Sequence, residues 1–211
     1  MAGDAGLLMC TWPKGGQNPN FDKHWQYMYF NECMSGFEWQ VASHMIYEGM
    51  LKEGVAIARA IHDRYDALLR NPYNEIECSD HYARAMASYG VFISICGFEY
   101  HGPKGHIAFS PRLTPENFKA AFITAEGWGT FSQKRQPNMQ TELLCLKWGQ
   151  LTLKQMAFDL PPGKTARMVQ VTVKSNEVKV IHRMTENRVI VTLAESVKIQ
   201  AGQDIKVKIQ W

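Results

Sequence analysis

The spacing of apolar residues changes along the chain, and this change limits the possible folds more than any other feature. In the first part, apolar residues such as Phe37, Val41 and Met45 lie four positions apart, which places them on one face of a helix. After about residue 132, apolar and polar residues alternate, which is typical of half-buried strands. The alternating segments are 167–173, 177–181, 188–193 and 204–209. The sequence therefore predicts helices followed by an antiparallel β module.

Glycine and proline divide the first part into three expected helices. The first covers 34–51, and Gly54 separates it from a second helix that stops at Asn71-Pro72, because the residue before proline avoids the helical region. A third helix is expected from about 81 to 97, with Ser79 or Asp80 as its N-cap. The polar stretch 133–138 contains Pro137 and marks a boundary, so we expect domains at 1–133 and 134–211.

The amino-acid composition indicates the cellular compartment and the class of binding partner. The longest apolar stretches, around 91–98 and 189–193, are shorter than the roughly 20 residues that span a bilayer. The first eight residues lack a basic region, and five cysteines are an odd number without a paired framework, so we expect a cytoplasmic protein with reduced thiols. Residues 134–211 hold most of the positive charge, but the cations are spaced singly along alternating segments. This spacing favours a solvated sheet face over nucleic-acid binding.

Polar side chains are densest between Asn71 and Arg84. A sugar site needs carboxylates that accept from hydroxyls, a guanidinium that donates, and an aromatic face that covers the ring. An alternative interpretation is structural, with Asp80 capping a helix and Glu75 or Glu77 pairing with Arg84. From these residue types alone, both interpretations stay open.

Several separate motifs, in order, resemble glycoside hydrolase family 116, which includes non-lysosomal glucosylceramidase and bacterial β-glucosidases. The resemblance covers roughly residues 9–133 closely and the β module more loosely. The motifs are FNECMSGFEWQVASHMIYEGM (30–50), IHDRYD (61–66), NPYNEIECSDHYARAMASYGVF (71–92), CGFEYHGPKGHIAFSPRL (96–113) and AEGWGTFSQ (125–133).

This resemblance implies a mainly α first part, an incomplete (α/α)6 toroid of helix hairpins, followed by the β module. It implies that Glu75 and Arg84 hold hydroxyls of the innermost glucose. Further residues in matching motifs are assigned only as possible wall residues, and for Trp39 the alternative is a core aromatic; they are Glu32, Glu38, Trp39, Tyr73 and Asn74. An isolated part of a toroid should also leave an apolar face uncovered, built from residues such as Phe37, Val41, Ile61 and Tyr65.

No catalytic residue is assigned. Hydrolysis that retains the anomeric configuration needs a nucleophilic carboxylate and an acid/base carboxylic acid about 5 Å apart. In this family both come from earlier motifs that are absent here. We therefore expect a C-terminal fragment of a retaining β-glycosidase that acts on β-glucosides. Its expected partners are that substrate and the missing N-terminal part of the catalytic domain, with no nucleic acid and no membrane span.

Three alternatives remain at this point. The chain is a non-catalytic carbohydrate-binding or complementing subunit of a split glycosidase, or a helical structural protein that kept the motifs. A zinc site could be drawn from Cys78, His81, Cys96, His101 and His106, but the ligand pairs lack zinc-finger spacing. We therefore expect no metal and no cofactor.

Overall fold

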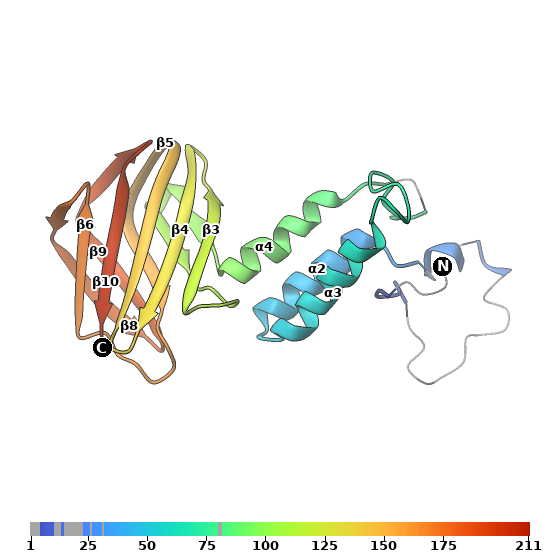
Figure 1. Ribbon diagram of the computed structural model, residues 1–211, viewed down its shortest axis with the longest axis horizontal. Helices are drawn as coiled ribbons and strands as arrows, with labels where there is room; N and C mark the ends of the chain where they lie inside the picture. The colour runs from blue at the N-terminus through green and yellow to red at the C-terminus, as the bar shows by residue number, and fades with distance from the viewer. Residues whose placement is uncertain (1–4, 11–13, 15–22, 26, 31, 80–81) are drawn as a thin grey trace. The chain divides into compact units, whose positions relative to one another are not determined.

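The computed structural model describes residues 5–10, 14, 23–25, 27–30, 32–79 and 82–211. The chain forms two compact units, Met1–Ser94 and Ile95–Trp211 (Figure 1). Asp80 and His81, the expected cap and the start of the expected third helix, lie outside the described residues. No helix in the described ranges is both long and apolar enough to cross a bilayer.

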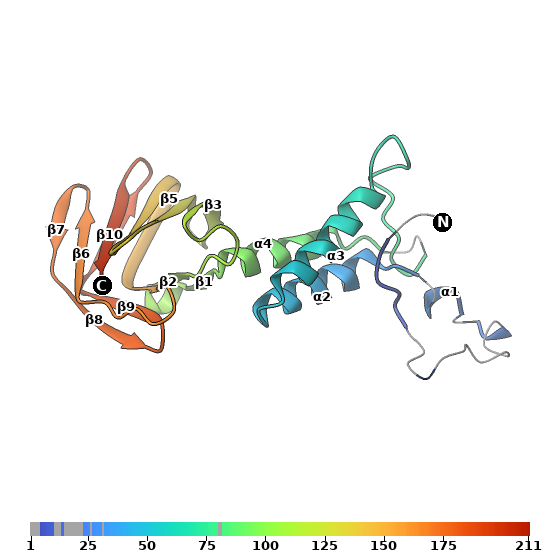
Figure 2. The same cartoon turned by 60° about the horizontal axis from the view of Figure 1, so that its bottom comes forward.

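The first unit contains a pair of packed helices, α2 (Ser35–Tyr47) and α3 (Leu51–Arg64), preceded by α1 (Tyr27–Phe30). Figures 1 and 2 show α2 and α3 side by side. Gly54 was expected to separate two helices but lies inside α3, where its missing side chain lets the helices approach closely. A Cβ there would lie 2.7 Å from the Ala42 carbonyl oxygen and from Ile46 Cγ1. Gly54 therefore determines the packing of this pair rather than its boundary.

The second and third helices are shorter than expected. The second ends at Arg64, since the Asp66 side chain accepts from the Leu68 amide at 2.8 Å and forms a turn that competes with the helix. Residues 82–84 are not helical, and a 3-10 turn, η2 (Ala85–Ala87), precedes α4 (Ser88–Cys96). Side chains from the 75–77 region bind Arg84, as described below, and hold this stretch out of a helix.

The expected uncovered apolar face is present only in part. Phe37 and Val41 are exposed, as expected. Ile61 is buried within the first unit. Tyr65 is half-buried, and its hydroxyl accepts from the Ile76 amide at 2.8 Å. The uncovered part of this face thus lies on α2.

The second unit is built from ten strands. They are β1 (Glu99–His101), β2 (His106–Phe109), β3 (Asn117–Ile123), β4 (Gly127–Gln136), β5 (Met139–Asp159), β6 (Met168–Val173), β7 (Asn176–Val178), β8 (Val180–Thr185), β9 (Arg188–Gln200) and β10 (Asp204–Gln210), with η3 (Gly102–Lys104) between β1 and β2. Strand pairing is antiparallel except between β2 and β5.

The long strand β5 belongs to both layers of the second unit. Its first half pairs with β4 and β10, and its second half pairs with β2 and β9 (Figures 1 and 2). The change occurs at Gly149, which has a φ of 75°, a conformation that glycine adopts at little cost. Between the layers, the rings of Phe109 on β2 and Phe131 on β4 stack with centroids 3.8 Å apart. Phe158 on β5 stacks on Phe131 at 6.2 Å, so aromatic side chains from both layers form the core.

The predicted fold class is wrong. The structure is mostly β, and the α-helices end at Cys96, whereas an incomplete helical toroid was expected up to residue 133. Strands β3 and β4 do alternate, with Phe131 inward and Thr130 outward, but β4 also places Gly127, Gly129 and Gln133 at inward positions. Because these inward residues are not apolar side chains, the alternation is weak in the sequence. The predicted C-terminal strands are present as β6, β7 with β8, β9 and β10.

Candidate functional site

Residues 71–79 and 82–84 of the first unit are anchored by a buried carboxylate. Glu77 is fully buried; its Oε2 accepts from the Gly36 amide at 2.8 Å and its Oε1 accepts from Arg84 Nε at 3.0 Å. Gly36 lies in the first turn of α2, where a negative charge is stabilised by the helix dipole. Only glycine fits there, since a Cβ would lie 2.6 Å from Arg84 Cδ and 2.8 Å from Glu77 Oε2.

Glu75 and Arg84, the two residues expected to bind sugar, lie next to each other but not as an ion pair. Glu75 Oε2 accepts from the backbone amide of Arg84 at 2.8 Å, whereas the Arg84 guanidinium binds Glu77. The guanidinium carbon also lies 5.2 Å from the centre of the Tyr82 ring and 6.0 Å from that of Phe37. In the part of the chain that the structure describes, Glu75 Oε1 and the two Nη atoms of Arg84 make no hydrogen bond. The Arg84 side chain is 48% exposed.

Glu32, expected in the wall of a sugar site, stabilises the loop. Both of its carboxylate oxygens accept from the Ser79 amide at 2.9 Å, and Oε1 also accepts from Ser79 Oγ at 2.9 Å. Cys78 and Ser79 have φ values of 51° and 62°, which is uncommon for residues other than glycine. The bonds from Glu32 thus hold a strained turn directly after Glu77.

Three further expected wall residues occupy two different environments. Tyr73 is 94% exposed, and its amide donates to Asn71 Oδ1 at 3.0 Å in a tight turn that also exposes Asn74. Trp39 is half-buried on α2. The structure therefore brings Glu75, Arg84 and the anchoring Glu77 together, while Tyr73 and Asn74 form the exposed tip of the same loop.

A second buried ion pair, between Glu38 and Arg64, was not expected. Arg64 Nη1 donates to Glu38 Oε1 at 3.0 Å and to the Ala5 carbonyl oxygen at 2.9 Å, while Arg64 Nη2 donates to Glu38 Oε2. The Leu7 amide also donates to Glu38 Oε1, at 2.7 Å. The pair joins α2, α3 and residues 5–7, and its two members are 26 residues apart, so local spacing carried no signal for it.

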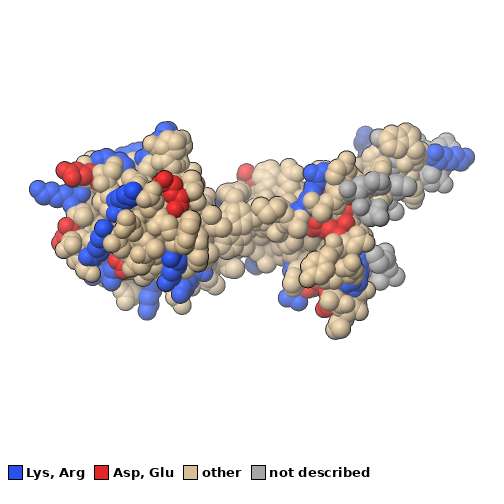
Figure 3. All heavy atoms as spheres, turned by 90° about the horizontal axis from the view of Figure 1, so that it is seen from above, with Lys and Arg blue, Asp and Glu red and all other residues tan. Residues whose placement is uncertain are grey.

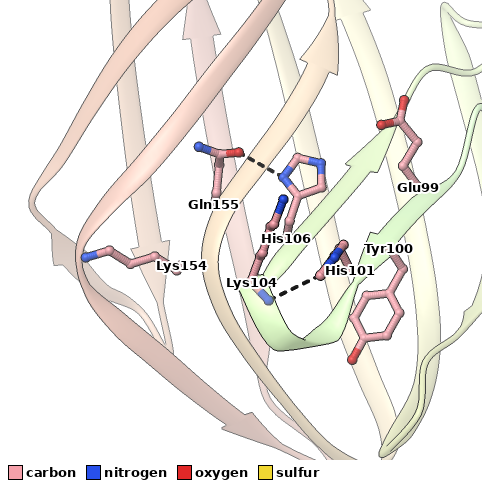
Figure 4. A pocket seen from close by; sticks show the side chains of 7 residues that line it. All are labelled: Glu99, Tyr100, His101, Lys104, His106, Lys154 and Gln155. Carbon is pink, nitrogen blue, oxygen red and sulfur yellow. Dashed lines mark hydrogen bonds between the residues drawn. The ribbon is translucent and has the colours of Figure 1, made fainter.

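The β unit carries a separate pocket of about 550 Å³ beside the β1–η3–β2 hairpin (Figure 4). His101 Nδ1 accepts from the Lys104 amide at 3.3 Å, so Nε2 carries the proton in the neutral ring. His106 Nδ1 lies 3.0 Å from Gln155 Oε1 and donates to it, because an amide oxygen only accepts. The lining residues are Glu99, Tyr100, His101, Lys104, His106, Lys154 and Gln155.

Two charged residues of this pocket are already engaged. Lys154 Nζ donates to the Ala194 carbonyl oxygen at 2.7 Å and extends away from the histidines in Figure 4. Glu99 binds Arg188 at 2.6 Å. The pocket therefore offers one imidazole donor, one imidazole acceptor and the Lys104 ammonium, a set suited to holding a small polar molecule.

Among the described residues, neither the surface charges nor the metal-binding side chains indicate a further site. Figure 3 shows Lys and Arg side chains scattered over the visible face of the β unit with Asp and Glu between them. Among the described residues, no cluster of three or more His, Cys, Asp or Glu is arranged to hold a metal ion. His81, a member of the zinc alternative, lies outside the described ranges.

No protein-family model matches the sequence, and no curated protein matches it. Among solved structures, the chain is similar to an α-L-rhamnosidase from Dictyoglumus thermophilum, with a TM-score of 0.34 and 12% identity. The match covers 63% of this chain and 16% of the rhamnosidase chain. This is a weak likeness to a glycoside hydrolase, and neither membership of family 116 nor β-glucoside specificity follows from it.

Proposed function

We propose that this chain is the sugar-binding, C-terminal part of a retaining β-glycosidase of the family 116 type that acts on β-glucosides. In this proposal, Glu75 and Arg84 contact the sugar, and the nucleophile and acid/base come from another part of the enzyme. The observation that carries the proposal is the way these two residues are held. Each uses one part of its side chain to fix its position and leaves the rest open.

The contacts suit recognition of hydroxyl groups. Glu75 Oε1 is an acceptor for a sugar hydroxyl, and the two Nη atoms of Arg84 are a donor fork for neighbouring oxygens. Glu77 holds Arg84 through Nε, and the Tyr82 ring lies close to the guanidinium. Because this side chain is already oriented, binding costs less conformational entropy than it would for a free arginine.

Three nearby carboxylates are committed to structure, which supports a binding rather than a hydrolytic role for this chain. Glu38 and Glu77 are buried in ion pairs, and Glu32 binds Ser79. Retaining hydrolysis needs one ionised and one protonated carboxyl group facing the same bond. Without another segment, we therefore expect the purified chain to cleave p-nitrophenyl β-D-glucoside no faster than background.

The test is binding of methyl β-D-glucoside to the 211-residue chain, measured by saturation-transfer NMR and titration, with the galactoside for comparison. We expect Glu75→Gln and Arg84→Lys to weaken glucoside binding roughly ten- to a hundredfold, the value of one hydrogen bond to a charged group. Arg59→Lys, in the exposed Arg59–Asp63 pair of α3, is the control and should leave binding unchanged. Glucoside binding that persists in both site variants would show that the site assignment is wrong.

The alternative is a complementing subunit of a split glycosidase, favoured by large exposed apolar side chains in the first unit. Leu68, Leu69 and Met86 are all strongly exposed there. Co-expression with a helical partner that carries the missing carboxylate motifs separates the two proposals. A stable complex with β-glucosidase activity from two separately encoded chains supports the subunit.

A further inference from the structure

Two tryptophans form a cross-strand pair on the outer surface of the β unit. Trp128 on β4 is paired with Trp148 on β5, and Ile123 on β3 is paired with Trp128. Directly paired residues project from the same face of a sheet, and these side chains are 48%, 62% and 58% exposed respectively. Strands β3, β4 and β5 lie side by side in Figure 1. We call this row of three side chains the aromatic row.

A β-bulge creates this pair. From Gly129 onward, β4 pairs with β5 in a regular register, in which Gly129 is opposite Leu146. Continuing that register would place Lys147 opposite Trp128, but the register shifts there and Trp148 takes this position. The shift turns Trp148 to the outer face, whereas Leu146 points into the core. Bulges are over-represented next to functional sites, where they re-aim a side chain.

A polar hollow of about 560 Å³ is lined partly by residues that lie close to the aromatic row in sequence. It is lined by Glu126, Gly149, Gln150, Gln200 and Ala201, of which Gly149 follows Trp148 and Glu126 lies two residues before Trp128. Gln150 Nε2 donates to Glu126 Oε1 at 3.1 Å across the hollow, which presents an amide and a carboxylate together. Gly149 permits this approach, since a Cβ there would lie 2.1 Å from the Glu126 carbonyl oxygen.

We propose that the aromatic row and the polar hollow bind a neutral oligosaccharide. Flat indole faces cover the apolar C–H faces of pyranose rings, while the amide and carboxylate groups of the hollow exchange hydrogen bonds with hydroxyls. This site lies in the second unit and involves neither Glu75 nor Arg84. It therefore stands or falls separately from the proposed function.

The size and chemistry of the surface favour a sugar over a macromolecular partner. Aromatic side chains bury about 150–250 Å² each, so two tryptophans that are 48% and 62% exposed and one isoleucine offer a few hundred Å² at most. A stable protein interface buries about 800 Å² on each partner. Lys147 is the one cation in the bulge, whereas a surface for anionic lipid needs a cluster of them.

Isothermal titration of the full chain with cellohexaose, xylohexaose and maltohexaose tests the proposal, with tryptophan fluorescence as a second readout. We expect at least one of the hexaoses to bind, and both Trp128→Ala and Trp148→Ala to weaken that binding at least about tenfold. Trp25→Ala removes another exposed tryptophan, in the first unit, and should have no effect. Arg59→Lys, in the exposed Arg59–Asp63 pair of α3, should also leave hexaose binding unchanged.

Gln150→Ala provides a variant that keeps both indoles and removes an amide of the hollow. It should weaken binding while leaving the thermal unfolding temperature unchanged. The proposal is overturned if none of the three hexaoses binds at about 1 mM, or if binding survives in both tryptophan variants. It is also overturned if sedimentation shows self-association that Trp128→Ala abolishes, since the aromatic row would then be a protein interface.

Discussion

The two carboxylate oxygens of Glu77 bind two different segments: Oε2 accepts from the amide of Gly36 on α2, and Oε1 accepts from the guanidinium of Arg84. The carboxylate is fully buried, whereas Arg84 is half exposed. One buried residue therefore fixes both the start of a helix and the orientation of the arginine proposed to bind sugar.

Replacing Glu77 should consequently affect stability and binding together. Glu77→Gln keeps the shape but loses the charge-assisted bonds, which are worth about 1.5–3 kcal/mol, so we expect the free energy of unfolding in urea to fall by that order. Glu75→Gln removes only a partly exposed carboxylate and should change unfolding by less than about 1 kcal/mol. Equal losses in the two variants would contradict the anchoring role of Glu77.

The Glu38–Arg64 pair gives a second prediction. Arg64→Met leaves the buried Glu38 carboxylate without its counterion, a change that costs about 3–5 kcal/mol in other proteins. We expect urea unfolding of the first unit to shift accordingly, while the β unit unfolds as before. Arg59→Met, in a pair of exposed residues, is the matched control and should cost less than about 1 kcal/mol.

Glu142 should make the stability of the β unit depend on pH. The residue is buried on β5, neither carboxylate oxygen has a hydrogen-bond partner among the described residues, and burial raises its pKa to about 8. The nearby Gln140 amide and the charge of Arg135 offset this rise only in part. Arg135 and Gln140 face other partners, since Arg135 Nε donates to Gln140 Oε1 and Gln140 Nε2 donates to the Asp159 carbonyl oxygen.

The raised pKa of Glu142 sets the direction in which stability changes with pH. The unfolded carboxyl ionises near pH 4.5 and the folded one near pH 8, so the folded state is progressively destabilised as pH rises between these values. The total is on the order of a few kcal/mol. Glu142→Gln should remove this slope and raise the melting temperature at pH 8 but not at pH 4. A melting temperature that responds equally at both pH values would contradict a neutral buried carboxyl.

Substitutions at Gly149 and Gly163 distinguish the cost of a left-handed backbone from the cost of close packing. Both have φ near 75°, but a Cβ at Gly149 would lie 2.1 Å from the Glu126 carbonyl oxygen, whereas Gly163 has open space around it. Gly163→Ala should cost about 1 kcal/mol for the left-handed conformation alone. Gly149→Ala should cost clearly more, because β5 and the 124–127 turn must separate. Thermal unfolding of the two variants measures the difference, and equal losses would contradict a close approach at Gly149.

Local pattern by itself determined the C-terminal strands and the helix pair. Alternation over 167–209 marks half-buried strands, and the turn at Lys174-Ser175 uses two residues with positive φ next to Asn176. These features depend on residues close together in the chain, so local periodicity and turn chemistry are sufficient to indicate them.

Tertiary structure decided which residues meet. The Arg84 guanidinium binds Glu77 rather than Glu75, and Glu77 is fixed in place by the Gly36 amide of α2. Glu38 binds Arg64 across 26 positions because only the packed helix pair brings these two charges together. The strands between residues 99 and 159 form because Phe109, Phe131 and Phe158 stack across two layers, although glycine and glutamine weaken the local alternation. A one-residue bulge turns Trp148 outward, since the face of a side chain depends on the register with the neighbouring strand.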